Sequence, residues 1–254
     1  MLNVWNFFDK VYVISIPTST RKPDLMKNFK LARINNYEII DFQPASKTVN
    51  DGSEKDLNVR EIMQHNFCDS TCQNITNNHL EIIKKAYQLN LDNVLIFEDD
   101  AYFELPLYLN KIRNIVDWLK KHTCEWDMFF FGYIPYPIPL LLPVSMDIVR
   151  VFTPMLGHAY AVNKSGINYI INNLYSFENK HIDSVYSSLP LKKYGVWGNV
   201  CFQSSDPALY TKAMQKVGLN ISLKTFSKVM ENVCIYLPIL IILILIVIVI
   251  IKIH

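Results

Sequence analysis

The sequence predicts an α/β fold in which helices cover a sheet containing parallel strands. Its main evidence is the four-residue apolar run 94–97, which ends in Glu98, Asp99 and Asp100. An apolar run of this length, bounded by polar residues, is typical of a strand buried on both faces. A β-branched segment at 11–16 has the composition of a first strand. Apolar residues at helical spacing precede and follow the acidic run, as the alternation of strands and helices in an α/β chain requires.

The remaining elements follow from composition and periodicity. Further strands are expected at 37–42, 126–133, 147–152 and 159–162, and helices at 24–31, 58–64, 78–87, 106–120, 165–174 and 181–186. Asn78 is expected to cap the helix that it begins, with Glu81 completing a capping box, so that His79 lies in the first turn.

The three acids are expected at the carboxyl end of their strand, the edge where open α/β sheets bind ligands. Adjacent carboxylates repel one another unless a positive charge lies among them, and a divalent cation with oxygen ligands is the usual solution. Because strand residues alternate between faces, Glu98 and Asp100 should project to one side and Asp99 to the other. An acidic turn without a ligand is the alternative interpretation.

Composition excludes some classes of function. Half of the residues are apolar and the net charge is only +2, so no global basic field indicates a nucleic-acid partner. The five cysteines are scattered without zinc-site spacing and are expected to be free thiols. Lysines far outnumber arginines, a bias that we attribute to AT-rich coding of viral or protist type.

The carboxyl-terminal segment predicts a membrane anchor. Residues 234–251 are eighteen uncharged and almost wholly aliphatic residues. A helix of this length spans about 27 Å, close to the thickness of a thin bilayer. Lys216, Lys224 and Lys228 precede the segment and only Lys252 follows it, which predicts a cytoplasmic main domain. The expected organisation is therefore a catalytic domain at 1–210, a helical neck at 211–233 and a single-pass transmembrane helix at 234–251.

The ordered set of helix 78–87, the strand ending in Glu98-Asp99-Asp100, and Ala101-Tyr102-Phe103 resembles the glycosyltransferase family 25 enzymes, the lipopolysaccharide-type and collagen-type sugar transferases. Eighteen residues separate His79 from Glu98, a spacing similar to that in the family. The resemblance extends with gaps from about residue 11 to 203. It implies a GT-A-like fold with a Rossmann-type mixed sheet flanked by helices.

The resemblance also implies a reaction, the transfer of a sugar from a nucleotide-diphosphate donor to a hydroxyl of a glycan, lipid or protein acceptor. Residues at the positions that match the family's donor site are Ser15, Arg21, Asp41, His79, Glu98, Asp99 and His158. Ser15 stands where the family has asparagine, and Asn78 where it has serine.

Catalysis in such an enzyme requires a metal and a base. Glu98 and Asp100 are expected to hold Mn²⁺ or Mg²⁺ at the diphosphate. Asp183 is expected to accept the proton of the acceptor hydroxyl, although an aspartate at a helix start can simply be a cap. The family is expected to invert the anomeric carbon, so that no protein nucleophile is needed.

Two other functions fit the same pattern. The departures at Ser15 and Asn78 leave room for a catalytically inactive, membrane-anchored protein that binds a nucleotide sugar or glycan. A nucleotidyltransferase or metal phosphohydrolase could also use paired acids at a strand end, although the sequence contains no phosphate-cradling GxxxxGK motif.

Overall fold

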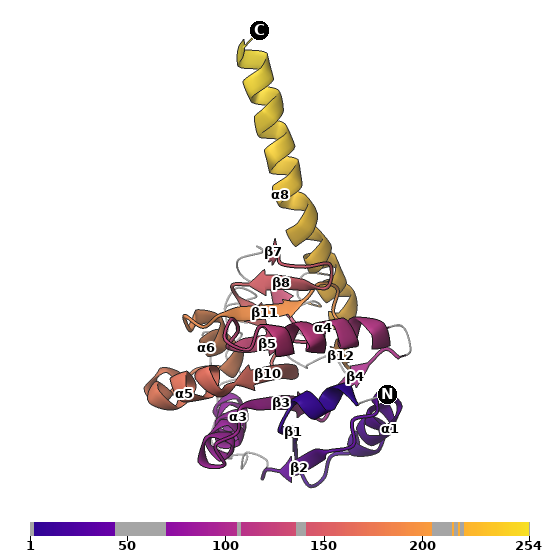
Figure 1. Cartoon of the computed structure of the whole chain (residues 1–254), viewed down its shortest axis with the longest axis vertical. Helices are drawn as coiled ribbons and strands as arrows, with labels where there is room; N and C mark the ends of the chain where they lie inside the picture. The colour runs from indigo at the N-terminus through magenta and orange to yellow at the C-terminus, as the bar shows by residue number, and fades with distance from the viewer. Residues whose placement is uncertain are drawn as a thin grey trace.

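The structure, a computed structural model, describes residues 3–43, 70–105, 108–135, 141–204, 215, 218 and 221–253. The predicted helix at 58–64 and the predicted helix start at Pro106 lie outside this part of the chain. Figure 1 shows a central sheet with helices packed around it and the long helix α8 extending away from the domain.

An eight-stranded mixed sheet forms the centre of the domain, with strand order β2-β1-β3-β10-β5-β11-β8-β7. Its strands are β1 (Lys10–Ser15), β2 (Tyr37–Asp41), β3 (Asn93–Glu98), β5 (Met128–Phe130), β7 (Leu141–Pro143), β8 (Ile148–Val151), β10 (Ala159–Asn163) and β11 (Lys193–Val196). Two small sheets pair β4 (Ala101–Phe103) with β12 (Cys201–Gln203), and β6 (Ile134–Pro135) with β9 (Pro154–Met155).

Strand β3 lies in the interior of this sheet, with a neighbour on each side, as its uninterrupted apolar sequence predicts. It pairs in parallel with β1 and antiparallel with β10. Residues 94–97 are fully buried, because core side chains cover both faces of the strand. The predicted α/β class, with a large mixed sheet flanked by helices, is thereby confirmed.

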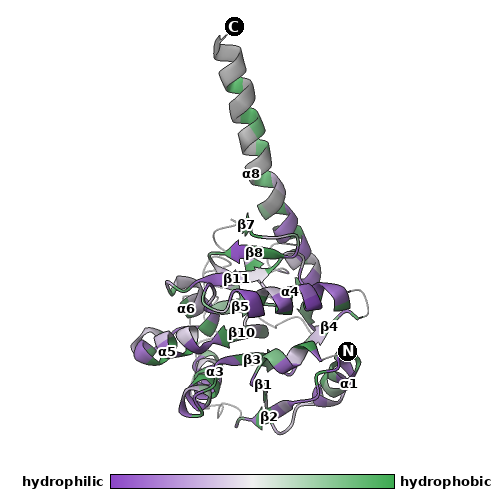
Figure 2. Ribbon diagram, in the orientation of Figure 1, coloured by the Kyte–Doolittle hydropathy of each residue, from purple (hydrophilic) through white to green (hydrophobic). Residues whose placement is uncertain are grey.

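Helices cover both faces of the sheet. The helices are η1 (Val4–Phe7), α1 (Lys22–Ala32), α3 (Ser70–Gln88), α4 (Leu109–Lys121), α5 (Lys164–Asn172), η2 (Leu174–Phe177), α6 (Ile182–Ser188) and α8 (Leu223–Ile253). Helices α1 and α4 contribute to one buried core, and α3, α5 and α6 contribute to the other. Figure 2 shows both hydrophilic and hydrophobic residues along α1, α3 and α5, as expected for amphipathic helices.

Helix α3 begins earlier than the sequence predicts. It starts at Ser70, so Asn78 lies within the helix, and the predictions that Asn78 is a cap and His79 a first-turn residue are wrong. Thr76 anchors the earlier turns, because its side chain is fully buried and its hydroxyl donates to the Lys180 carbonyl oxygen at 2.9 Å. A tertiary contact therefore stabilises the helix at this point.

The cysteines do not all match the prediction of free thiols. Cys72 is disulfide-bonded, so the prediction is wrong for this residue. Cys124, Cys201 and Cys234 are free, and the last two are buried.

The predicted transmembrane anchor is contradicted. None of the helices formed by the described residues is both long enough and apolar enough to cross a membrane. The predicted span at 234–251 is continuous with the first turns of α8, which are hydrophilic in Figure 2 and pack on the domain. Cys234, the first residue of that span, is itself buried in the core. The single-pass anchor is therefore wrong, and so is the cytoplasmic placement that we derived from the lysines around it.

Candidate active site

The predicted site residues gather at one edge of the sheet because their strands run in parallel. In the register of β1, Ser15 lies opposite Asp41 of β2, and Ile14 lies opposite Glu98 of β3. The carboxyl ends of the three strands therefore meet at the same edge. His158 immediately precedes the antiparallel strand β10 and reaches this edge from the other direction, where its carbonyl oxygen accepts the Glu98 N–H at 2.9 Å.

Asp99 is held by two partners, one at the end of β1 and one in the loop that follows this strand. The Ser15 hydroxyl donates to its Oδ2 at 2.6 Å, and Arg21 Nη2 lies 2.6 Å from its Oδ1. Asp99 is buried, whereas 45% of the Arg21 side chain is exposed. The second guanidinium nitrogen lies 3.7 Å from Asp100 Oδ2. Arg21 thus covers two buried carboxylates and still presents a charged face to solvent.

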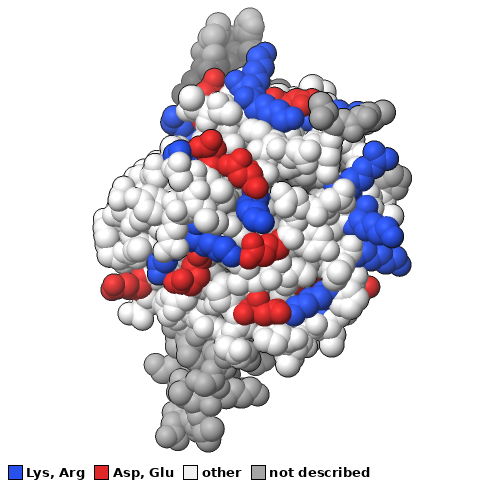
Figure 3. Space-filling model, turned by 60° about the horizontal axis from the view of Figure 1, so that its bottom comes forward, with Lys and Arg blue, Asp and Glu red and all other residues white. Residues whose placement is uncertain are grey.

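Strand β3 ends at Glu98, so the expected alternation of faces does not continue through the next two acids. Asp99 and Asp100 lie in a turn, and both approach Arg21. Next to them, Asp41 forms an ion pair with Lys22, whose Nζ lies 2.5 Å from its Oδ1. On the face drawn in Figure 3, acidic and basic side chains are interspersed and form no large field of one sign.

Asp100 is the least satisfied of these acids. Its side chain is buried, and its Oδ1 has no hydrogen-bond partner in the part of the chain that the structure describes. Burial, together with the negative charge of Glu98, raises the pKa of Asp100 to about 7, although Arg21 acts in the opposite direction. The surroundings of the Asp100 carboxylate therefore do not fully compensate its negative charge. A cation or a hydrogen-bond donor could do so.

Glu98 ends a chain of buried hydrogen bonds. His79 Nε2 lies 3.3 Å from Glu98 Oε1, His79 Nδ1 lies 2.9 Å from the Tyr160 hydroxyl, and this hydroxyl lies 3.0 Å from that of Tyr186. A carboxylate can only accept, so His79 donates through Nε2. In the neutral ring Nδ1 then accepts from the Tyr160 hydroxyl, which in turn accepts from Tyr186. His79 is fully buried behind Glu98. The structure therefore places it where it can orient Glu98.

His79 influences the charge state of Glu98. Burial acts to raise the pKa of Glu98, but the hydrogen bond that His79 donates lowers it, and the net direction is below its ordinary value. Gln203, at the end of β12, approaches the other oxygen, with its Nε2 3.4 Å from Glu98 Oε2. Glu98 is thus kept ionised beside Asp100.

Asp183 lies at the start of α6, as predicted, and is buried. Its Oδ2 accepts the backbone N–H of Leu156 at 3.0 Å and lies 3.8 Å from His181 Nδ1. A Cβ atom added to Gly157 would lie 3.2 Å from Asp183 Oδ1 and 3.7 Å from His79 Cε1, so the backbone at Gly157 passes between the two side chains. The helix cap itself is His181, whose Nδ1 accepts the Asp183 N–H.

The donor set suits a metal ion that is held chiefly by its substrate. Among the described residues, no three His, Cys, Asp or Glu side chains are grouped so as to hold a metal. Mg²⁺ and similar ions are, however, often bound by one or two carboxylates together with substrate phosphates and water. The unpartnered Oδ1 of Asp100, next to the ionised Glu98, fits that role.

Sequence reasoning missed three residues of this site: Gln203, Tyr160 and Tyr186. Gln203 reaches Glu98 because β12 pairs with β4, a contact between segments about one hundred residues apart that no local pattern indicates. Tyr160 did carry a signal. A tyrosine within an otherwise apolar buried strand needs a hydrogen-bond partner for its hydroxyl, and a titratable group is a common one.

No family model matches the chain, and no curated protein is significantly similar to it. Similar solved structures include A197 from STIV, with 11% identity over 77% of this chain and 82% of that chain at a TM-score of 0.42. A glycosyltransferase involved in the glycosylation of the major capsid of PBCV-1 has 9% identity over 83% of this chain and 98% of its own, at a TM-score of 0.43. UTP-bound UGPase from Acinetobacter baumannii has 10% identity over 87% and 97%, at a TM-score of 0.45. TM-scores of this size do not decide a function, which has to be argued from the contacts of the site.

Proposed function

We propose that the chain is a metal-dependent glycosyltransferase that moves a sugar from a nucleotide-diphosphate donor to an acceptor hydroxyl. One observation carries the proposal. Asp100, at the carboxyl end of a central parallel strand, is buried with an unpartnered oxygen, beside a second carboxylate and a half-exposed arginine. Clustered negative charge of this kind is costly in a stable fold and is typical of a binding site for a cation.

Arg21 supplies the attraction for the donor. Its guanidinium contacts Asp99 and Asp100 from the solvent side, and 45% of the side chain is exposed. A diphosphate lying over this edge could therefore accept hydrogen bonds from the same guanidinium group. Ser15 holds Asp99 in place, and Asp41 and Lys22 extend the polar edge toward the nucleoside.

Glu98 and Asp100 are the residues that would hold Mn²⁺ or Mg²⁺. When bound, such an ion neutralises charge on the diphosphate as the leaving group departs. The buried chain from His79 to Tyr186 would hold Glu98 in one orientation. Asp100 keeps the unpartnered oxygen for the ion.

Transfer also needs a base for the acceptor hydroxyl. We propose Asp183, which is buried close to the cluster formed by Glu98, His79 and His158. Its Oδ2 accepts the Leu156 N–H, and this bond would fix the carboxylate while the hydroxyl approaches. Direct attack at the anomeric carbon would invert it, and the acceptor proton would pass to the carboxylate.

A donor screen tests the proposal. The parent chain and the variant Asp100→Asn would be incubated with a panel of nucleotide sugars and Mn²⁺. The control is Asp117→Asn, because Asp117 is an exposed acid on α4 that pairs with Lys120. We expect the parent and Asp117→Asn to release nucleoside diphosphate, and Asp100→Asn to lose at least about a hundredfold of that rate.

The products separate the alternatives. Release of pyrophosphate or inorganic phosphate in place of nucleoside diphosphate would favour a nucleotidyltransferase or phosphohydrolase. Binding of donor without turnover in the parent chain would favour a protein that only binds nucleotide sugars. Full metal-dependent activity in Asp100→Asn would refute the role of Asp100.

A further inference from the structure

The small sheet of β4 and β12 links the first turns of α8 to the acid cluster. Tyr102 and Phe202 lie opposite each other in its register, with ring centroids 6.0 Å apart, so both rings project from the same face. Lys224 and Lys228 of α8 lie over the Phe202 ring, with their Nζ atoms 4.9 and 5.4 Å from its centroid. Helix α8 therefore covers this face of the small sheet.

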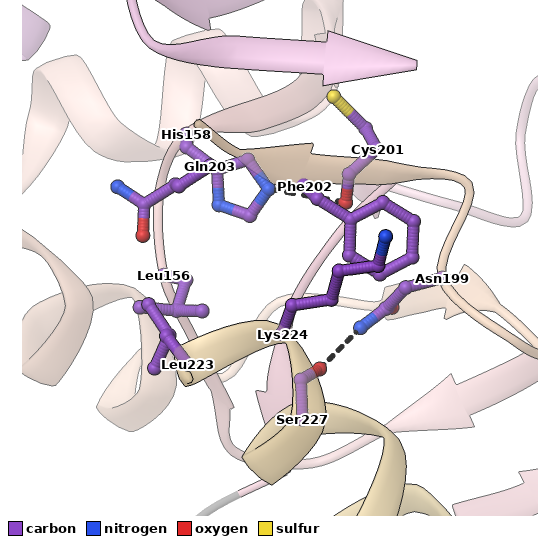
Figure 4. Close-up of a pocket in the computed structure, with 9 residues that line it drawn as sticks. All are labelled: Leu156, His158, Asn199, Cys201, Phe202, Gln203, Leu223, Lys224 and Ser227. Atoms are coloured by element: carbon purple, nitrogen blue, oxygen red, sulfur yellow. Dashed lines mark hydrogen bonds between the residues drawn. The ribbon is translucent and has the colours of Figure 1, made fainter. Parts of the chain in front are cut away.

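Further contacts hold α8 against the small sheet. Lys224 forms an ion pair with Glu104, the residue that follows β4. Ser227 is buried, and its hydroxyl oxygen accepts from Asn199, just before β12, at 2.7 Å. Figure 4 shows Lys224 beside Phe202, and Ser227 bonded to Asn199, at the narrow pocket between α8 and β12. The first turns of α8 are thus part of the domain and support β12 from one side.

The opposite face of β12 carries Gln203 to the acid cluster. Side chains alternate along a strand, so Gln203 and Phe202 point to opposite faces. Gln203 lies opposite Ala101, and the next residue, Ser204, donates its N–H to the Asp100 carbonyl oxygen at 2.7 Å. The last residue of β12 and the last of the three acids therefore lie side by side at one end of the small sheet.

The side-chain amide of Gln203 presents its nitrogen to the acids. Its Nε2 lies 3.4 Å from Glu98 Oε2, and because a carboxylate cannot donate, the nitrogen and not the oxygen faces Glu98. Burial is the largest influence that raises the pKa of Asp100, and a hydrogen bond from Gln203 acts in the opposite direction. One amide group, which has two hydrogens, can therefore donate to both acids.

Packing alone does not explain a glutamine at this position. Gln203 Oε1 is buried and has no hydrogen-bond partner in the part of the chain that the structure describes. An apolar side chain of the same length would fill the space without leaving a buried oxygen unpartnered. Neighbouring carboxylates in a buried site repel one another, however, and a donor placed between them reduces this repulsion. The amide nitrogen therefore gives a reason for the glutamine.

We propose that Gln203 is a positioning residue of the acid cluster, that its amide holds Glu98 and Asp100 together for a divalent cation, and that the first turns of α8 keep it there through β12. Carboxylate oxygens have several lone pairs, so the amide and a cation can contact the same acids. The effect on cation affinity rests on the proposed function, whereas the support that α8 gives to the amide does not.

Hydrogen exchange of the Gln203 side-chain amide tests the support from α8. The full chain would be labelled with ¹⁵N-glutamine, and the Gln203 resonance would be assigned by its loss in Gln203→Met. We expect its exchange to be at least about tenfold slower than that of Gln88, an exposed glutamine at the end of α3. Exchange should become faster in Lys224→Met, which removes the ion pair with Glu104, and stay unchanged in Lys120→Met, which alters an exposed lysine of α4.

Cation binding tests the effect of the amide on the acids. Calorimetry would titrate Mn²⁺, in the presence of UDP, into the parent chain and into Gln203→Met, which keeps the length of the side chain and removes the amide. We expect the affinity for Mn²⁺ to fall about tenfold in Gln203→Met, as for other residues that orient metal ligands, and about threefold in Lys224→Met. Affinity for UDP without metal should change less than about twofold, because Arg21 is unaltered. A substitution that only weakened the fold would lower both affinities alike.

The outcomes separate this inference from the proposed function. An unchanged affinity for Mn²⁺ in Gln203→Met, an equal loss of both affinities, or exchange of the Gln203 amide as fast as that of Gln88 would overturn the inference, while binding of UDP and Mn²⁺ by the parent would leave the proposed function standing. If the parent bound neither UDP nor Mn²⁺, the proposed function would fail. The exchange of Gln203 would then decide the inference, which faster exchange in Lys224→Met would support and unchanged exchange would overturn.

Discussion

The ends of the central strands form two opposite edges of the sheet. The buried polar groups at these two edges differ in how fully they are hydrogen-bonded. At the edge where β1 and β3 end, Asp100 keeps an unpartnered oxygen beside Glu98. At the other edge, Asn163 is also buried, but both ends of its amide are bonded. Its Oδ1 accepts from Gly166 N at 3.0 Å and Ser165 Oγ at 2.8 Å, and its Nδ2 donates to the carbonyl oxygens of Thr123 and Trp126.

Lys193 shows that the same contrast applies to charged groups. It begins β11 opposite Met128, at the edge of Asn163, and is only 5% exposed. Its Nζ donates to the carbonyl oxygens of Tyr186, Ser187 and Leu189 at 3.0, 2.6 and 3.0 Å. A buried polar group whose hydrogen-bonding capacity is fully used is compatible with a structural role, whereas one with free capacity indicates a ligand. The difference between Lys193 and Asp100 is thus one of satisfied bonds and not of burial.

The largest effect is expected at the satisfied edge. Replacing Asn163 with Ala would remove the hydrogen-bond partner of Gly166 N and of the Trp126 carbonyl at a buried site. We expect the free energy of unfolding to fall by about 3 kcal/mol. Urea denaturation would measure this loss, and affinity for UDP should stay within twofold of the parent. A large loss of UDP affinity, measured where the variant is still folded, would contradict the view that Asn163 supports stability and not ligand binding.

Lys193 provides a test by pH. Burial lowers its pKa to about 8. Between that value and the unfolded-state pKa of about 10.4, the unfolded chain binds more protons than the folded one, so stability rises with pH in this window. The gain over the window is expected to be about 2 to 3 kcal/mol.

Urea denaturation of the parent and Lys193→Met between pH 7.5 and 10 would measure this gain. The control is Lys120→Met, since Lys120 is an exposed lysine on α4. The rise should persist in the control and disappear in Lys193→Met. An equal rise in all three chains would show that Lys193 titrates normally.

At the edge where Asp100 keeps an unpartnered oxygen, a substitution should change the affinity for a ligand. Arg21→Ala removes the guanidinium that faces both Asp99 and solvent, and we expect UDP to bind about thirtyfold more weakly, equivalent to about 2 kcal/mol. The control Arg150→Ala removes an exposed arginine of β8, which contacts Phe152. Calorimetric titration would compare the three chains. Equal losses from both substitutions would indicate a general charge effect and not a donor site.

Local patterns predicted the strands that carry the site but not the contacts between them. The strand ending at Glu98 was visible because its apolar run has no polar interruption, and β1 and β2 because of their β-branched residues. The partner of Glu98 was also anticipated in part, since His79 was expected near the acids. The sequence did not indicate how deeply His79 is buried. It lies in the interior of α3, which begins at Ser70, and it packs fully buried behind Glu98.

The carboxyl-terminal segment was misjudged for a related reason. Uncharged length was taken as sufficient for a membrane span, but α8 runs on from turns that carry Lys224, Lys228 and Glu231 and that pack on the domain. Glu231 accepts the Gly198 N–H, and Ser227 bonds Asn199 at 2.7 Å. Hydropathy averages do not contain such contacts, because they come from segments about thirty residues away.

The smallest expected effect concerns the far end of the chain that supports Glu98. Tyr186→Phe removes one hydroxyl, after which Tyr160 can still donate to His79 Nδ1. We expect the free energy of unfolding to fall by about 1 kcal/mol and UDP affinity in the presence of Mn²⁺ to change less than threefold. Tyr160→Phe should cost more in both measurements, because it leaves His79 Nδ1 without a donor and frees the ring that orients Glu98. Urea denaturation and calorimetry on the two variants would test this order, and the reverse order would mean that the hydrogen bonds do not run from Tyr186 toward Glu98.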